Sequence, residues 1–247
     1  MRIVVTGATG NVGTSLVAAL GSDSRVSEIV GLARRLPRLR SPRTTWVQAD
    51  VLTAPLEDLF RGADAVVHLA WLIQPSRDGA LLEAVNVDGT RRVFEAAASA
   101  GVGALVHASS IGAYSAGPVD VAVDESWPTE GTASSFYSRH KVAAERMLDG
   151  IEAAHPDLRV VRLRPALIFK REAASEIRRL FIGPLLPSPL VHPRLIPILP
   201  LPPGLVLQAV HAEDVGEAYR LAATTPGARG AYNVAAEPVL DLSLIHI

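Results

Sequence analysis

The chain has 247 residues, with 24 basic and 25 acidic side chains, a formal net charge of −1 and 49% apolar residues. This length and apolar fraction allow one large domain with a sizeable core and exclude an intrinsically disordered chain. The near-neutral charge argues against a nucleic-acid-binding protein, which needs a basic surface to neutralise phosphates. The absence of cysteine excludes disulfides and thiolate chemistry and is typical of the reducing cytoplasm, where we expect the protein to be located. The seven histidines show no close metal-binding spacing, so we expect no metal site.

Short apolar runs alternate with helical patterns along the first two thirds of the chain. The predicted strands cover residues 2–6, 26–33, 44–50, 64–70, 104–110 and 158–165, and the predicted helices cover residues 11–20, 80–100 and 134–154. Apolar runs of this length that alternate with helices are typical of a parallel sheet covered on both faces. The sequence therefore predicts an α/β fold with a doubly wound, Rossmann-type parallel sheet.

Residues 180–210 form an apolar stretch that is long enough to cross a membrane. Eight of the 18 prolines of the chain lie within it. Because proline removes helix donors and clashes with the preceding turn, a continuous spanning helix is excluded there. We expect a covering loop or lid and no membrane insertion.

A glycine-rich turn follows the first predicted strand. In TGATGNVG, Gly7, Gly10 and Gly13 lie between this strand and the helix that begins near Asn11, with Val12 in its first turn. Glycine allows a tight turn and a close approach of the backbone to a pyrophosphate, which the N–H groups at the start of the helix can bind. This context predicts a dinucleotide-binding site.

The end of the second predicted strand bears on the choice of dinucleotide. An acidic residue that binds the ribose 2′-hydroxyl is expected about 20 residues after the last glycine, near Ala33, but no carboxylate is present there. Arg34 and Arg35 follow directly, and arginine suits a 2′-phosphate through forked hydrogen bonds. We therefore expect NADP to be preferred, with NAD as the other possibility; two solvated loop arginines are the alternative explanation.

Several ordered motifs give the chain a resemblance to a known family. They are the glycine turn, Asp50-Val51, HLA at 68–70, NVDGTRRVFEAA at 86–97, HASSIGAY at 107–114, YSRHK at 137–141, LRP at 163–165 and VHAEDV at 210–215. With these motifs the chain resembles the extended short-chain dehydrogenase/reductase family, the NAD-dependent epimerase/dehydratase group. The resemblance implies that Asp50 and Val51 flank the adenine and that Leu69 and Ala70 lie beside the ribose and pyrophosphate.

The candidate catalytic residues are Ser110, Tyr137 and Lys141. Tyr137 and Lys141 are four residues apart in a predicted helix and so share one face. We expect the lysine ammonium to lower the tyrosine pKa, so that the phenol can exchange a proton with a substrate near neutral pH and both residues also contact the cofactor. The resemblance supplies the serine, four residues before Tyr114.

Three functions compete on these residues. We favour an NAD(P)-dependent oxidoreductase that transfers a hydride between nicotinamide and a carbonyl or hydroxyl substrate, with a nucleotide-sugar epimerase as the alternative. Dehydration is disfavoured, because Ile111-Gly112 stand where dehydratases of the family carry an Asp-Glu pair. The apolar segment after residue 165 suits an apolar small-molecule substrate better than a diphosphate sugar. A non-catalytic NADP-binding regulator is disfavoured because such relatives lack the Tyr-Lys pair.

We expect two parts within the chain. Residues 1–165 would form the dinucleotide-binding and catalytic domain, and residues 166–247 mainly a small substrate-side lobe with some segments returning to the main fold. The ending, LDLSLIHI, predicts that this lobe is truncated and incomplete. The resemblance also implies a homodimer formed through helices 80–100 and 134–154.

Overall fold

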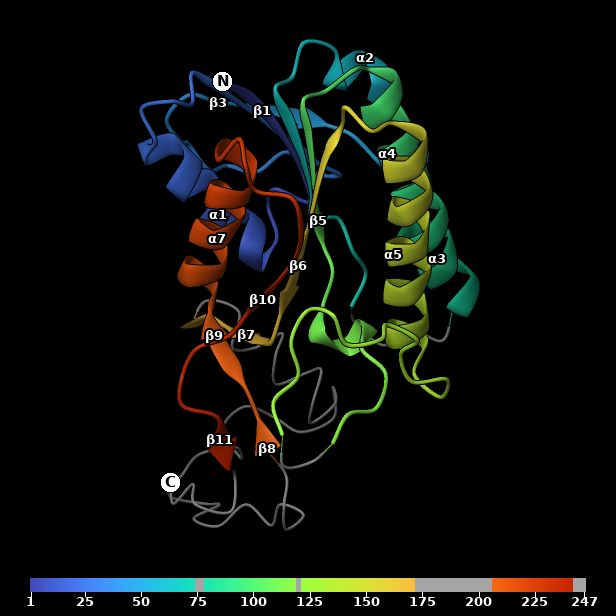
Figure 1. Ribbon diagram of the computed structural model, residues 1–247. Helices are drawn as coiled ribbons and strands as arrows, with labels where there is room; N and C mark the ends of the chain where they lie inside the picture. The colour runs from blue at the N-terminus through green and yellow to red at the C-terminus, as the bar shows by residue number, and fades with distance from the viewer. Residues whose placement is uncertain (74–77, 119–120, 172–205, 242–247) are drawn as a thin grey trace.

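The computed structural model describes residues 1–73, 78–118, 121–171 and 206–241. The centre of this part is a seven-stranded parallel sheet with helices on both faces (Figure 1). Its strands are β1 (Arg2–Thr6), β2 (Glu28–Ala33), β3 (Thr44–Gln48), β4 (Ala65–His68), β5 (Ala104–Ala108), β6 (Arg159–Pro165) and β10 (Gly230–Val234). Their order is β10-β6-β5-β4-β1-β2-β3, which places the first strand at the reversal of strand order. The prediction of a doubly wound, Rossmann-type parallel sheet is confirmed.

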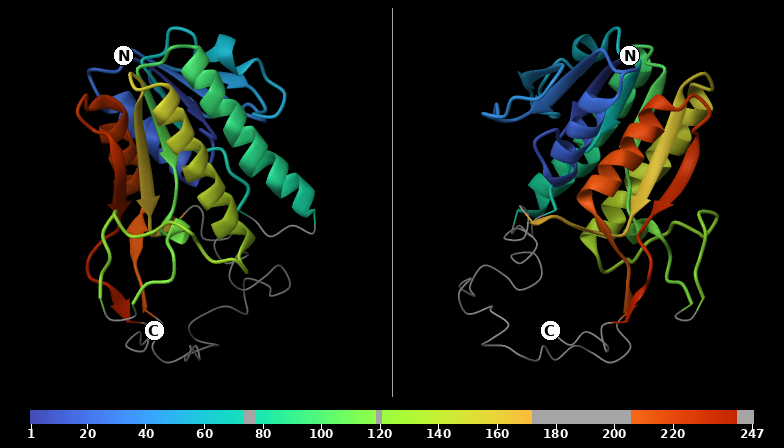
Figure 2. Two further views of the ribbon diagram at one scale, coloured as in Figure 1. Left: turned by 45° about the vertical axis from the view of Figure 1, so that its right-hand side comes forward. Right: turned by 90° about the vertical axis from the view of Figure 1, so that its left-hand side faces the viewer.

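Two layers of helices cover the sheet. One face carries α1 (Asn11–Ser22) and α7 (Ala212–Thr224). The other carries α2 (Leu56–Phe60), α4 (Gly89–Ser99) and α5 (Phe136–Ala154), with α3 (Gly79–Glu83) and the π-helical turn η1 (Ala84–Asp88) leading directly into α4. Helices α4 and α5 lie side by side on their face (Figure 2). The predicted helix 80–100 is thus present, but it is interrupted by η1.

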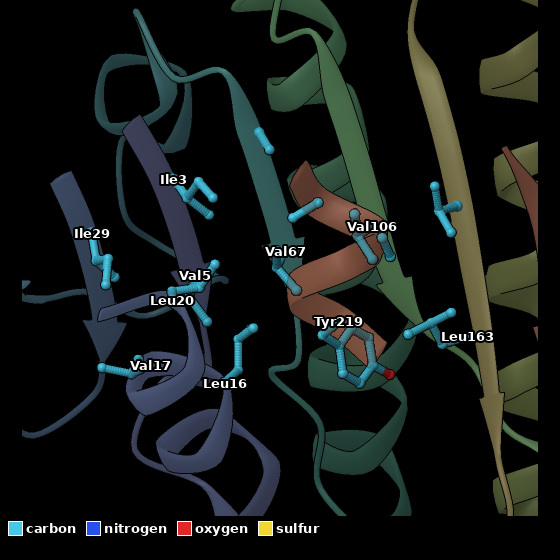
Figure 3. Close-up of a cluster of buried hydrophobic side chains, with 14 of the residues drawn as sticks. Ile3, Val5, Leu16, Val17, Leu20, Ile29, Val67, Val106, Leu163 and Tyr219 are labelled. Atoms are coloured by element: carbon cyan, nitrogen blue, oxygen red, sulfur yellow. The ribbon is translucent and has the colours of Figure 1, made fainter. Parts of the chain in front are cut away.

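A separate apolar core lies on each face of the sheet. On the α1 and α7 side, Leu16 and Leu20 meet Ile3 and Val67 of the strands, and Tyr219 of α7 lies among them (Figure 3). Strand side chains point alternately to the two faces, so β1 supplies Val4 to the opposite core. Strands buried on both faces explain why these segments are continuous apolar runs.

Two elements after residue 165 belong to the main sheet and its helical layer. Strand β10 joins the sheet beside β6, and α7 packs against α1. A Cβ atom on Gly216 of α7 would lie 2.8 Å from the carbonyl carbon of Ser15, so this glycine permits the close approach of the two helices. The division of the chain at residue 165 stays a prediction.

Two small strand pairs complete the described part. Strands β7 (Leu167–Phe169) and β9 (Ala209–His211) pair in parallel, and β8 (Val206–Leu207) pairs antiparallel with β11 (Leu240–Asp241). Residues 206–210 of the predicted covering loop are therefore in or between strands. The rest of that loop, and the chain end predicted to be truncated, lie outside the described residues. No helix in the described ranges is long and apolar enough to span a membrane.

Candidate active site

The glycine turn after β1 is too tightly packed for a side chain at Gly7 or at Gly13. Gly7 has a φ of +69°, and a Cβ atom there would lie 2.6 Å from the backbone nitrogen of Ala70. A Cβ on Gly13 would lie 2.3 Å from the carbonyl oxygen of Gly7. Both distances are far below van der Waals contact. Only glycine at these positions lets the turn, the loop after β4 and helix α1 approach one another so closely.

Helix α1 begins at the edge of this turn with an open N-terminus. Gly10 is its N-cap and offers no side-chain hydrogen bond, and the first turn contains no acidic residue. The buried Oδ1 atom of Asn11 has no hydrogen-bond partner in the part of the chain that the structure describes. Free N–H groups and the positive end of the helix dipole favour an anion here. The residues present therefore fit a dinucleotide pyrophosphate.

A cleft extends from the glycine turn across the carboxyl ends of β1, β2 and β4. It is lined by Thr6, Gly7, Thr9, Gly10, Leu32, Ala33, Arg34, Ala49, Asp50, Val51, Leu69, Ala70, Trp71, Leu72 and Val85. Most of the predicted cofactor residues are thus in one wall, and Asn11, Val12 and Gly13 form the first turn of α1 beside it. Arg34 and Arg35 are both exposed, and only Arg34 belongs to the lining.

The far end of the site lies where β5 meets the start of α5. Ser110 leaves the sheet, and its hydroxyl accepts a hydrogen bond of 3.0 Å from the backbone N–H of Gly112 as the cap of η2 (Ile111–Ala113). A Cβ on Gly112 would lie 3.1 Å from the Tyr137 ring, so glycine lets the ring approach this turn. The Ser110 Oγ atom would lie 3.4 Å from the same Cβ position, so the structure brings the predicted serine and tyrosine together at Gly112.

Lys141 is enclosed beneath these two residues. Its side chain is 3% exposed, and its ammonium donates a hydrogen bond of 2.6 Å to the carbonyl oxygen of Ala108. The same Nζ atom lies 3.3 Å from the centre of the Trp71 indole and 5.7 Å from the centre of the Tyr137 ring. The three predicted catalytic residues are therefore adjacent, and Trp71 joins them.

The expectation that Lys141 lowers the Tyr137 pKa is wrong for the protein alone. Burial raises the pKa of the Tyr137 phenol, and the hydrogen bond with Ser110 offsets this only in part. Burial also holds the pKa of Lys141 well below its usual value, although the nearby charge of Glu145 acts in the opposite direction. Desolvation disfavours both charged forms, an effect that the four-residue spacing alone could not reveal.

A buried ion-pair network fixes β5, β6 and α5 relative to one another. Glu145, one turn after Lys141, accepts hydrogen bonds of 2.8 Å from both Nε and Nη2 of Arg164 and one of 2.5 Å from the Ser109 hydroxyl. Burial pushes the Glu145 pKa upward, but these hydrogen bonds outweigh it and hold the pKa below its usual value. Paired in this way, the carboxylate anchors the strand end that carries Ser110 to the helix that carries Lys141.

Two stacked histidines lie behind the site. The rings of His68 and His107 are 5.6 Å apart, and burial lowers the pKa of His68 to about 3 and that of His107 well below its ordinary value. His68 is hydrogen-bonded to Thr6 and Thr90, at 2.7 and 3.0 Å. Neither ring nitrogen of His107 has a partner among the described residues. Both histidines are therefore neutral and serve in packing.

Sequence reasoning missed Trp71 and Glu145. Trp71 follows the HLA motif directly, at the point where the chain leaves β4 and enters the cleft. Glu145 follows Lys141 by four residues on the same helix face. Both positions could have been found from the sequence, because Trp71 directly follows the HLA motif and Glu145 lies one helical turn after Lys141.

The comparisons with known proteins identify the family of the chain. The sequence model of the NAD-dependent epimerase/dehydratase family matches residues 3–235. An uncharacterized protein of Mycobacterium tuberculosis is 31% identical over 215 residues, which cover 87% of this chain and 19% of that protein. The NAD(P)-dependent L-arabinose 1-dehydrogenase of Haloferax volcanii is 41% identical over 109 residues, covering 44% of this chain and 41% of the enzyme. The chain thus spans less than half the length of either relative.

The solved structures agree in fold. MoeE5 in complex with UDP-glucose and NAD superposes with a TM-score of 0.78 and 27% identity, over 98% of this chain and 79% of that one. The glycine turn and the cleft form one continuous surface, and Trp71 of the cleft lining contacts Tyr137 and Lys141. The chain belongs to the NAD-dependent epimerase/dehydratase family of extended short-chain dehydrogenases/reductases.

Proposed function

We propose that the protein is an NAD(P)-dependent oxidoreductase that interconverts a carbonyl and a hydroxyl group on a small-molecule substrate. The observation that carries the proposal is the approach of Ser110 and the Tyr137 ring to each other at Gly112, with the buried Lys141 Nζ atom 5.7 Å from the centre of the tyrosine ring. Trp71, which belongs to the lining of the proposed dinucleotide cleft, contacts both Tyr137 and Lys141 and so connects this arrangement with the cleft. The L-arabinose 1-dehydrogenase relative agrees with this reaction type.

Each of the site residues has a distinct role in this proposal. Gly7, Gly10 and the first turn of α1 would hold the pyrophosphate, and the Lys141 side chain would donate a hydrogen bond to the ribose next to the nicotinamide. When bound, the nicotinamide supplies or accepts the hydride. The Ser110 hydroxyl holds the substrate oxygen. In the direction of reduction, the proton moves from Tyr137 Oη to that oxygen, and the Lys141 ammonium stabilises the phenolate that remains.

The direction of the Tyr137 pKa favours a proton donor. Because burial raises this pKa, the phenol is protonated at neutral pH and is ready to give its proton to a carbonyl oxygen. For the oxidation of an alcohol, the Tyr137 phenol would first have to lose its own proton. A cationic nicotinamide ring bound beside Tyr137 would lower the pKa of the phenol again, since a nearby positive charge stabilises the phenolate.

We propose NADP as the preferred cofactor. Ala33 ends β2 where a carboxylate would bind a free ribose 2′-hydroxyl, and Arg34 lies in the cleft lining next to it. Gln48 donates a hydrogen bond of 3.1 Å to the Arg34 carbonyl oxygen and steadies this backbone. NAD stays the alternative, and the NAD complex of MoeE5 is the observation in its favour.

A nucleotide-sugar epimerase is the second candidate. MoeE5, which was solved with UDP-glucose and NAD, supports it. An epimerase would use the same Tyr137 and Ser110 to oxidise and then reduce one carbon, with no net change in the cofactor. Against it stands the apolar segment Leu167–Phe169 after β6, which supplies no polar side chain for a diphosphate sugar.

We also propose a homodimer formed through the outer surfaces of α4 and α5. These helices lie side by side, and Phe94, Met147 and Ile151 line a shallow groove between them. Sedimentation velocity would show a dimer, whereas a concentration-independent monomer would contradict this arrangement. A cytoplasmic location stays a prediction that fits the absence of cysteine.

The proposed reaction is tested by absorbance at 340 nm with a panel of carbonyl, alcohol and UDP-sugar substrates. An oxidoreductase changes the absorbance in proportion to the product formed. An epimerase converts a UDP-sugar, as seen by chromatography, without a lasting absorbance change. Binding of NADPH with no conversion of any substrate would instead favour a regulator and contradict the proposal.

A further inference from the structure

Trp71 is the residue at the catalytic end of the cleft for which the proposed reaction has not accounted. It lies in the cleft lining immediately after the loop that packs on Gly7. The centre of its indole is 3.3 Å from the Lys141 Nζ atom, and the edge of Tyr137 meets it at 6.2 Å between ring centres with an interplanar angle of 77°. One side chain thus contacts both the lysine and the tyrosine.

The contact with Lys141 is of the kind that fixes an ammonium group. A lysine side chain has four flexible carbons and loses much of its rotamer freedom when it is held in one place. The Ala108 carbonyl takes only one of the three N–H donors of Lys141. The indole face covers a second side and attracts the charge through its quadrupole, a contact that gains strength when water is excluded.

The backbone beside Trp71 is itself held in place. Asn86, fully buried in η1, accepts a hydrogen bond of 2.8 Å from the Leu72 N–H and donates one of 3.0 Å to the Leu72 carbonyl. Both polar groups of this residue are therefore paired with one side-chain amide. Since Leu72 follows Trp71 directly, this double hydrogen bond restrains the indole over the lysine.

We propose that Trp71 is a positioning residue, which holds the Lys141 ammonium against Tyr137 and toward the cofactor cleft. The proposal rests on the proposed function, because it assigns Trp71 to the proposed catalytic pair. Trp71 donates and accepts no proton in the reaction. The Trp71 indole restricts the positions that the Lys141 ammonium can occupy and limits the access of water to the ammonium.

The test uses the rarity of lysine in this chain. The full chain contains only Lys141 and Lys170, so protein labelled with 13C at lysine Cε gives two side-chain signals, assigned with Lys170→Arg. We expect the Lys141 Cε protons to be shifted upfield by the indole ring current. Trp71→Phe keeps an aromatic face and should keep a smaller shift, Trp71→Leu should abolish it, and Trp127→Phe, a tryptophan outside the cleft lining, should leave it unchanged.

The functional readouts are the NADPH dissociation constant and kcat of the same variants. Trp71→Leu should weaken NADPH binding and lower kcat, each by about tenfold, and Trp71→Phe should restore most of both. A wild-type Lys141 signal without the upfield shift, or NADPH binding in Trp71→Leu as tight as in the wild type, would overturn the proposal. Absence of turnover in the wild type would contradict the proposed reaction only, because the NMR shift and the NADPH affinity test Trp71 without it.

Discussion

At the glycine end of the cleft, Gly7 and Gly13 leave no space for a Cβ atom, whereas at the catalytic end Trp71, Tyr137 and Lys141 fill the space with side chains. The glycine end is defined by backbone contacts and by the open start of α1. The catalytic end is defined by buried polar groups whose pKa values burial has shifted. Added atoms should therefore damage the first region, and altered chemical groups should damage the second with little effect on the fold.

The largest expected effect is that of Tyr137→Phe on turnover. Loss of one phenolic oxygen removes the proposed proton donor while the ring continues to pack against Gly112 and Trp71. We expect kcat to fall by about 10²- to 10⁴-fold and the NADPH dissociation constant to change by less than about threefold. Steady-state kinetics and a fluorescence titration measure the two quantities. Turnover close to that of the wild type would remove Tyr137 from the reaction.

At the glycine end, one added methyl group should abolish cofactor binding. In Gly13→Ala the new Cβ would lie 2.3 Å from the Gly7 carbonyl oxygen, so the turn must move, at a cost of about 1–3 kcal/mol in the free energy of unfolding. The matched control is Gly150→Ala in α5, where no atom lies within 4 Å of the new Cβ. This control should raise stability by about 0.5–1 kcal/mol. Urea unfolding and NADPH titration distinguish the two, and equal behaviour of the two variants would contradict the account.

A smaller effect is expected from the two adjacent arginines. Arg34 lines the cleft and Arg35 does not, so Arg34→Ala should weaken NADPH about 10- to 100-fold relative to NADH, as for loss of a charge-assisted hydrogen bond of about 1.5–3 kcal/mol. Arg35→Ala should change this ratio much less. Dissociation constants for both cofactors test the pair. A larger effect of Arg35→Ala would show that the wrong arginine was assigned to the 2′-phosphate.

The smallest expected effect is a change in the pH dependence of stability. His107 is neutral when folded because burial holds its pKa well below the value of 6.5 that it has when unfolded. Below about pH 6.5 the unfolded chain therefore binds a proton that the folded chain does not, and stability falls as the pH falls. His107→Phe removes up to one proton from this linkage, about 1.4 kcal/mol per pH unit.

Urea unfolding of the wild type and His107→Phe between pH 7 and pH 5 measures this slope. Because His107 has no hydrogen-bond partner among the described residues, the variant should be close to the wild type in stability at pH 7. His68→Phe is a useful contrast, since it would leave the hydroxyls of Thr6 and Thr90 without their partner and should destabilise the fold at every pH. Parallel slopes for wild type and His107→Phe would show that His107 is charged or accessible in the folded protein.

Most of the sheet could be predicted from the sequence because each central strand is a short apolar run between helices. The predicted ends were too long where polar capping took over: Ser109 and Ser110 leave β5, since Ser110 caps η2. None of the strands after residue 165 was predicted, including β10 of the central sheet, because in these short segments the apolar pattern cannot separate strand from loop.

The candidate site could be predicted by residue type but not by its energetics. The glycine turn and the Tyr137-Lys141 spacing pointed to the β1–α1 turn and to helix α5, and the role of these residues stays a prediction. The choice between Arg34 and Arg35 depends on the direction of two neighbouring side chains, which no pattern encodes. The direction of the Tyr137 pKa depends on burial by Trp71 and the surrounding chain, and this contact joins residues distant in sequence.

The most direct test of the central claim, that one cleft holds a dinucleotide between the glycine end and the catalytic end, is a fluorescence titration of the 247-residue chain with NADPH and NADH. We expect saturable binding at one site per chain, tighter for NADPH, that is lost in Gly13→Ala and kept in Tyr137→Phe. Absence of saturable binding for both nucleotides in folded wild-type protein would contradict it.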